Sequence, residues 1–169
     1  MNKGQLLTVD YIIGVMLFML LLTACLYVWE NILYKIQEDQ LTLELMNTAK
    51  RISDQFVRTS GNPNNWESNV SAASSVGIAI DDRVISQAKF AELAGMNYSN
   101  LRYYLGVGSF DVYLKLSNTS GSVFGEAGNR PAEALVVNTR RIVSMDNQTA
   151  LLDVSVWSPE VGNVLTPIT

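Results

Sequence analysis

The chain has 169 residues, enough for one domain of ordinary size with an appendage, and its net charge of −4 argues against nucleic acid as a partner. It has no histidine and only one cysteine, Cys25, which excludes Ser-His-Asp and Cys-His catalysis, histidine-bound zinc, an internal disulfide and an Fe–S cluster. Only 17% of its residues are charged, against about 25% in typical soluble domains, and the deficit lies near the N-terminus.

Residues 11–29 form a run of 19 residues without a charge. As a helix this run is roughly 28 Å long, about the thickness of the hydrocarbon layer of a membrane. No small-residue cleavage site of a secretory signal follows it, so we expect the segment to be retained. Lys3 favours a cytoplasmic N-terminus. The sequence therefore predicts a single-pass membrane protein whose remaining chain lies outside the cell.

The residues before this run, Lys3, Gly4 and Gln5, resemble the class III signal peptide of archaeal type IV pilin-like proteins. The resemblance implies that residues 1–4 are removed by a membrane aspartic protease of the prepilin-peptidase kind, which leaves Gln5 as the new N-terminus. The family usually has an acidic residue at the fifth mature position, whereas Asp10 is the sixth here. The resemblance implies that Asp10 registers neighbouring subunits by pairing with the α-amino group of Gln5; the alternative is a position at the lipid headgroups.

After residue 29 the pattern becomes amphipathic without a break, and no proline or glycine occurs between Gly14 and Gly61. The pattern predicts one helix over residues 5–59, with its membrane segment at 11–29. Apolar residues recur at steps of mostly three and four: Ile32, Ile36, Leu43, Met46 or Leu45, Ala49, Ile52 and Phe56. We expect the following domain or neighbouring copies in a bundle to cover this stripe, since the heptads are too few and imperfect to favour a coiled coil.

The sequence of residues 61–169 predicts a small extracellular globular domain that begins with helices. Trp66, in a turn-rich connection, is expected to dock into the core. A helical rhythm over residues 85–93 has Ser86 as its N-cap, and a second short helix is expected to begin at an N-cap Ser99 and end at Gly106.

The period then changes to two, which predicts strands. Alternation is clear over residues 110–117, and residues 134–145 and 151–157 form an expected antiparallel hairpin. The fold class is therefore α+β, a long N-terminal helix packed on a small antiparallel sheet, which is also the pilin fold. Further strings within residues 45–117 are similar to archaeal pilin-like proteins, notably those of methanogens, for example Gly61 to Trp66 and Tyr104 to Gly108.

Enzymatic motifs are weak. Ser86 and Lys89 have the S-x-x-K spacing of serine acyl-transferring enzymes, but the companion motifs are missing and Lys89 is expected to be solvated. Gly106 and Gly108 are expected to form a turn, because a dinucleotide fingerprint needs a preceding strand and a third glycine. We predict no enzyme and no cofactor.

Two acidic pairs contain oxygen ligands suited to a cation, namely Asp81 with Asp82 and Asp146 with Asp153. They lack EF-hand spacing, and carboxylates in turns are far commoner than metal sites, so we predict no metal. Four N-x-S/T sequons, all in the outer domain, would suit a glycosylated surface protein: Asn69, Asn97, Asn118 and Asn147.

The resulting hypothesis is a structural subunit of an archaeal cell-surface filament, assembled with other pilin subunits through its apolar helix. The membrane and the processing peptidase are its other expected partners. The first alternative is a single-pass, membrane-anchored extracellular binding domain that does not polymerise. A second alternative, a hydrolase or transferase on a membrane stalk, needs a convergent polar site that this domain without histidine does not display. Adhesion, motility, secretion and DNA uptake all stay open as roles, as does major or minor subunit.

Overall fold

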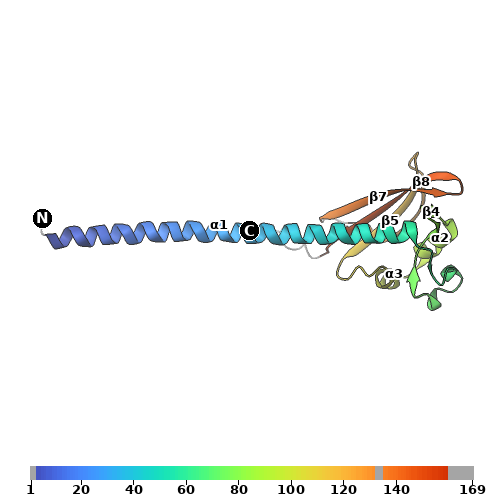
Figure 1. Cartoon of the computed structure of the whole chain (residues 1–169), viewed down its shortest axis with the longest axis horizontal. Coiled ribbons are helices and arrows are strands. Elements are labelled where there is room, and N and C mark those ends of the chain that lie inside the picture. Colours follow the sequence, from blue (N-terminus) through green and yellow to red (C-terminus); the bar gives the residue numbers. More distant parts are fainter. Residues whose placement is uncertain (1–2, 132–134, 160–169) are drawn as a thin grey trace. The chain divides into compact units, whose positions relative to one another are not determined.

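The structure, a computed structural model, describes residues 3–131 and 135–159, and for residues 3–9 it describes the backbone alone. The chain forms two compact units, Met1–Leu41 and Thr42–Thr169; we call the second the head. In chain order (Figure 1) the elements are α1 (Lys3–Arg58), β1 (Gly61–Asn62), the 3-10 helices η1 (Trp66–Ser68) and η2 (Val70–Ala72), β2 (Ser75–Val76), β3 (Ala79–Asp81), β4 (Val84–Ile85), α2 (Gln87–Gly95), α3 (Tyr98–Leu105), β5 (Asp111–Asn118), β6 (Val123–Gly128), β7 (Val136–Met145) and β8 (Gln148–Trp157).

The first unit is the N-terminal part of α1, and its apolar side chains are uncovered. From residue 10 to residue 40 every side chain is exposed, including Leu20 at 66% and Trp29 at 62%. A helix forms here because Leu, Met and Ala have high helix propensity and no proline interrupts the run.

The last turns of α1 belong to the head and supply one side of its core. Leu45, Ala49, Ile52 and Phe56 are completely buried, at the three- and four-residue spacing of one helix face. The buried face is shorter along the helix than the predicted apolar stripe. Leu45 is buried and not Met46, and the structure leaves the earlier positions Ile32, Ile36 and Leu43 exposed at 50%, 46% and 59%. The head therefore covers only the part of the stripe from Leu45 onward.

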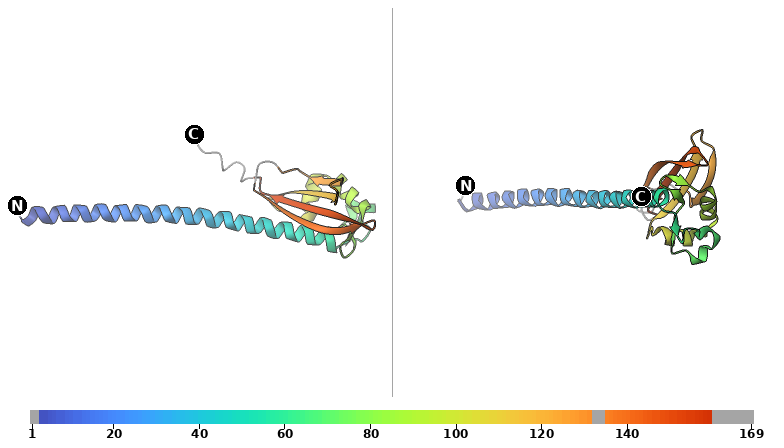
Figure 2. Two further views of the ribbon diagram at one scale, coloured as in Figure 1. Left: turned by 90° about the horizontal axis from the view of Figure 1, so that it is seen from above. Right: turned by 45° about the vertical axis from the view of Figure 1, so that its right-hand side comes forward.

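The main sheet of the head has six strands in the order β3-β4-β7-β8-β5-β6. Its pairings are antiparallel except for a single parallel contact of β4 with β7, Val84 opposite Ser144. The long strands lie side by side in both views of Figure 2. Alternate residues of β5 and β8 are completely buried: Val112, Leu114, Leu116, Leu152, Val154 and Val156. The predicted α+β fold class, with an apolar N-terminal helix ahead of the sheet, is confirmed.

The short helices correct one predicted cap. Ser86 caps α2 as predicted, its hydroxyl oxygen accepting from the backbone N–H of Lys89. The cap of α3 is Asn97 and not Ser99. Asn97 has a non-helical backbone, with φ −58° and ψ 136°, and its side-chain oxygen accepts from the N–H of Ser99, which is already helical. The helix ends at Gly106 in the left-handed conformation, φ +57°.

Strand β6 was not predicted, because its two glycines weaken the strand signal. A side chain at Gly125 would meet the ring of Phe90, so the residue is small to let α2 approach the sheet. The β7–β8 hairpin turns at Asp146 and Asn147, with φ values of +50° and +61°, the backbone of a two-residue type I′ turn.

Candidate functional site

The most distinctive surface of the first unit is the apolar segment of α1. Among the described residues, one helix near the N-terminus is long and apolar enough to cross a membrane. Within that segment the large apolar side chains range from Val15 at 38% exposed to Tyr11 at 72%. This segment is compatible with a membrane anchor.

The predicted processing and registration residues lie at the start of this helix. The backbone of Gly4 and Gln5 is part of α1, while their side-chain surroundings lie outside the described part of the structure. Asp10 is exposed, and no ion pair within residues 10–131 and 135–159 includes it. A carboxylate next to an apolar segment in lipid needs a partner or a position in the headgroups.

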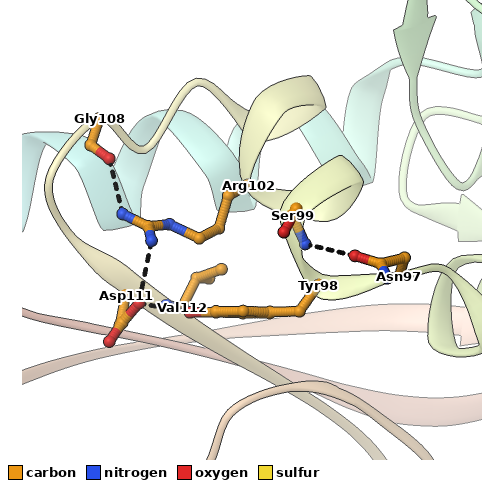
Figure 3. Close-up of polar contacts among 7 residues, drawn as sticks. All are labelled: Asn97, Tyr98, Ser99, Arg102, Gly108, Asp111 and Val112. Atoms are coloured by element: carbon orange, nitrogen blue, oxygen red, sulfur yellow. Dashed lines mark hydrogen bonds and ion pairs between the residues drawn. The ribbon is translucent and has the colours of Figure 1, made fainter.

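A polar network in the head joins α3 to the start of β5 (Figure 3). The Tyr98 hydroxyl donates to Asp111 Oδ1 at 2.7 Å and accepts from the backbone N–H of Val112 at 3.2 Å. Arg102 Nη1 lies 3.8 Å from the same carboxylate oxygen, and Arg102 Nη2 donates to the Gly108 carbonyl at 2.8 Å. The network clamps the α3–β5 connection.

The environment of Tyr98 in this network raises the pKa of its phenol. Burial, followed by the hydrogen bond to Asp111, raises the pKa of Tyr98 from 10.0 to about 12. The raised pKa means that the folded head favours the neutral phenol. Its contribution to stability is therefore fully present below pH 10 and is lost as the pH rises from 10 towards about 12.

Tyr98→Phe is expected to lower the free energy of unfolding of the head by about 1–3 kcal/mol, because it leaves Asp111 and the Val112 N–H without a buried partner. Thermal unfolding followed by circular dichroism of the full chain in detergent measures this loss. In a pH titration followed by near-ultraviolet absorbance, the variant should also lose the tyrosine that ionises at about pH 12. Tyr103→Phe is the control, since Tyr103 is 81% exposed. Equal stability of the two variants would contradict the clamp.

The S-x-x-K pair is structural, and the expectation that Lys89 is solvated is wrong. Lys89 is only 5% exposed. Its ammonium group donates to the carbonyl of Ser60 at 2.8 Å and to that of Asn64 at 2.6 Å. The side chain therefore ties α2 to the loop that follows α1, and Ser86 serves as the helix cap. Sequence spacing could not show this, because the partners are backbone atoms of a distant segment.

The acidic pairs have other roles in the structure. The carboxylate of Asp153 receives two hydrogen bonds from Arg140, at 2.6 and 3.0 Å. Asp81 accepts from the backbone N–H of Asp82 in the turn after β3, and Asp146 lies in the β7–β8 turn. Within residues 3–131 and 135–159 no three histidine, cysteine or acidic side chains are grouped to hold a metal ion.

The four sequon asparagines differ in accessibility. Asn69, Asn97 and Asn147 are exposed, while Asn118 is half-buried. Asn97 also caps α3, and the Asn118 side chain accepts from the Ser122 N–H at 2.8 Å. Only Asn69 and Asn147 therefore combine exposure with a side chain for which the structure gives no hydrogen bond.

One cavity in the head, of about 550 Å³, opens beside the end of α1 and is lined by polar side chains. Three of those side chains are engaged with the backbone. Gln55 donates to Val76 O, Thr59 to Gln55 O and Tyr104 to Val70 O. Arg58, Ser60 and Ser75 also line this cavity.

Taken together, these features define an α+β head joined to an apolar helix that is long enough to cross a membrane. The end of that helix packs with a mostly antiparallel sheet in the core of the head, a pilin-like arrangement. The chain belongs to a family of unknown function (DUF7287), whose model matches residues 1–157. No curated protein and no solved structure matches the chain.

Proposed function

We propose that the protein is a type IV pilin-like structural subunit of an archaeal cell-surface filament. One observation carries the proposal: the apolar side chains of α1 from Tyr11 to Ile36 are uncovered on every side of the helix. A helix that only packed against one domain would need a single apolar stripe. A helix that moves from lipid into a bundle of like helices needs an apolar surface all around.

The energetics favour transfer from one apolar environment to another. In water the uncovered surface would cost about 25 cal/mol for each Å² of apolar area. Lipid removes this cost before assembly, and neighbouring α1 helices remove it afterwards. The head then stays outside the cell, with the N-terminus held in the cytoplasm by Lys3, and the exposed sequons Asn69 and Asn147 face the compartment where glycans are added.

Asp10 gives the assembly a register. Asp10 directly precedes the predicted membrane segment at 11–29, where a carboxylate needs a partner or a position in the headgroups. Cleavage after Gly4 would create an α-amino group on Gln5 of a neighbouring copy, and this amine is a suitable partner for the carboxylate. The pairing would hold adjacent helices at one relative height.

Cleavage after Gly4 is the first test. In membranes that contain the archaeal prepilin peptidase, mass spectrometry of the mature chain should find Gln5 as its first residue. Gly4→Val is expected to abolish the cleavage, because the resemblance places the cut directly after this glycine. Gly14→Val is the matched control, since a side chain at Gly14 would meet no other atom within 4 Å. An intact Met1, or a chain that begins past residue 30, would refute the processing step.

A membrane-anchored binding domain that never polymerises is the second candidate, and the position of Asp10, one residue later than usual in pilins, favours it. The two differ in where the mature protein is found. A filament subunit is recovered in sheared surface appendages, and Asp10→Asn reduces that recovery while the membrane pool persists. Mature protein that is confined to the membrane would support the anchored domain instead.

A further inference from the structure

A second cavity of the head, about 280 Å³ in volume, is lined by several positively charged side chains. Its lining comes from the last turn of α1, the β3–β4 turn and β7: Asp54, Val57, Arg58, Arg83, Arg140, Arg141 and Ile142. Four of the seven arginines in the chain therefore line one cavity, in a protein whose net charge is −4. Neither charge balance nor solubility requires this concentration of like charge.

Two of these arginines have an acidic partner among the described residues and two do not. Arg140 pairs with Asp153 at 2.6 Å, and Arg141 pairs with Asp54 at 2.7 Å. No ion pair within the described residues 10–131 and 135–159 includes Arg58 or Arg83. Four guanidinium groups and two carboxylates leave a surplus of two positive charges. Asp81 and Asp82 precede Arg83, but no ion pair within the described residues includes either of them.

The backbone around Arg83 is fixed against both neighbouring elements. Its N–H donates to the carbonyl of Val57 in α1 at 2.8 Å, and its own carbonyl accepts from the N–H of Ser144 in β7 at 2.7 Å. Arg83 has a φ of +59°, in the left-handed region where glycine or asparagine is the ordinary choice. The tight turn between β3 and β4 accounts for this conformation, and it holds Arg83 between the end of α1 and β7.

A structural role explains only part of the cluster. Arg58 is in the last turn of α1, where a cation interacts favourably with the carbonyl end of the helix. Arg83 is outside any helix, and this reason does not apply to it.

We propose that the cavity binds a phosphate or sulfate group. The surplus of two positive charges matches a doubly charged tetrahedral oxyanion, and guanidinium groups donate paired hydrogen bonds to such oxygens. Arg58 and Arg83 supply the free donors, while the paired Arg140 and Arg141 form the positive wall behind them. Ile142, 68% exposed, gives an apolar contact for whatever carries the group.

The test is calorimetric titration of phosphate and of sulfate into the full chain in a nonionic detergent. We expect saturable binding of one ion, weakened about tenfold by Arg58→Gln or Arg83→Gln and abolished by the double variant. Arg130→Gln is the control of equal charge change, since Arg130 pairs with Glu126 and lies outside the cavity. It should bind like the unmodified protein.

The source of the group is resolved by a second titration, with a short-chain phosphatidic acid below its micelle concentration. Tighter binding than that of phosphate assigns the cavity to a lipid headgroup, and equal or weaker binding assigns it to a free oxyanion. Both results support the proposed chemistry. Arg83→Lys, which keeps the charge but loses the paired donors, should weaken binding with little change in near-ultraviolet circular dichroism. The Arg83→Lys variant therefore still tests the proposal if the double variant does not fold.

Three results would overturn the proposal. The first is no saturable binding of phosphate or sulfate at millimolar concentration. The second is an equal loss in Arg130→Gln, which would show a general charge effect. The third is dissociation of the assembled protein by Arg58→Gln and Arg83→Gln without any anion binding, which would assign the cavity to carboxylates of a second copy. The proposed role of α1 does not depend on any of these results.

Discussion

Trp66→Ala is expected to lower the free energy of unfolding of the head by about 3–5 kcal/mol, the range for removal of a buried indole from a core. Trp66 is completely buried, and its ring N–H donates to the carbonyl of Gly77 at 2.8 Å. A side chain at Gly61 would overlap the indole, which shows how closely the backbone approaches the ring. The substitution therefore leaves both a cavity and an unpaired carbonyl.

This loss should lower the midpoint of thermal unfolding of the head by more than about 10 °C. Near-ultraviolet circular dichroism and amide hydrogen exchange of β5 and β8, both on the full chain in detergent, measure it. Trp29→Ala is the matched control, because Trp29 is 62% exposed in the first unit. Trp66→Phe keeps much of the volume and loses the hydrogen bond, so its effect should be intermediate. A midpoint for Trp66→Ala equal to that of Trp29→Ala would contradict the role of Trp66 in the core.

Lys89→Met is expected to destabilise the head by about 2–3 kcal/mol, although a methionine of similar length would suit an ordinary buried position. The ammonium group of Lys89 is the donor for the carbonyls of Ser60 and Asn64, and the loop from 60 to 64 is held to α2 through it. Without that donor the carbonyls must find water or remain unpaired, and either outcome loosens the loop.

The matched control is Lys50→Met, because Lys50 is exposed on α1. Hydrogen exchange should accelerate in residues 59–69 of the Lys89→Met variant before it does so in β8. Lys89→Arg retains donors and should recover part of the stability. If Lys89→Met and Lys50→Met unfold at the same temperature, the buried ammonium contributes nothing to the fold.

Local patterns predicted much of this molecule correctly. The uncharged run at residues 11–29 and the absence of proline predicted a continuous helix, and α1 spans Lys3–Arg58. Ser86 was identified as an N-cap because the capping hydrogen bond reaches only three residues along the chain. The alternation over residues 110–117 predicted β5 because one face of that strand is buried.

Predictions that depended on distant contacts were less successful. Ser99 was predicted as the cap of α3, but Asn97 is the cap, since both residue types suit an N-cap and the backbone conformation decides which residue directly precedes the helix. Strand β6 was missed because Gly125 reflects the approach of Phe90 from another element. Periodicity predicted the stripe on α1 but left open whether the following domain or neighbouring copies cover it, and the structure shows that the head covers it from Leu45 onward.

The candidate sites also depended on distant contacts that local patterns in the sequence do not show. Four arginines gather at one cavity from positions 58, 83, 140 and 141, and no sequence spacing connects a helix end, a turn and a strand. Asp153 resembled a cation ligand in sequence, yet its cross-strand neighbour in the structure is Arg140. Register between strands decided that pairing.

The sequence by itself determined the features that depend on nearest neighbours along the chain: the apolar helix, its amphipathic continuation, the cap of α2 and the alternating strands. These follow from helix and strand periodicity and from the length of a membrane span. Only the tertiary structure decided that Lys89 is buried, that Arg58 and Arg83 line a shared cavity without an acidic partner among the described residues, and where the cover of α1 begins. Each of these depends on which surfaces meet across long stretches of chain, and burial and electrostatic pairing act through space, independent of sequence separation.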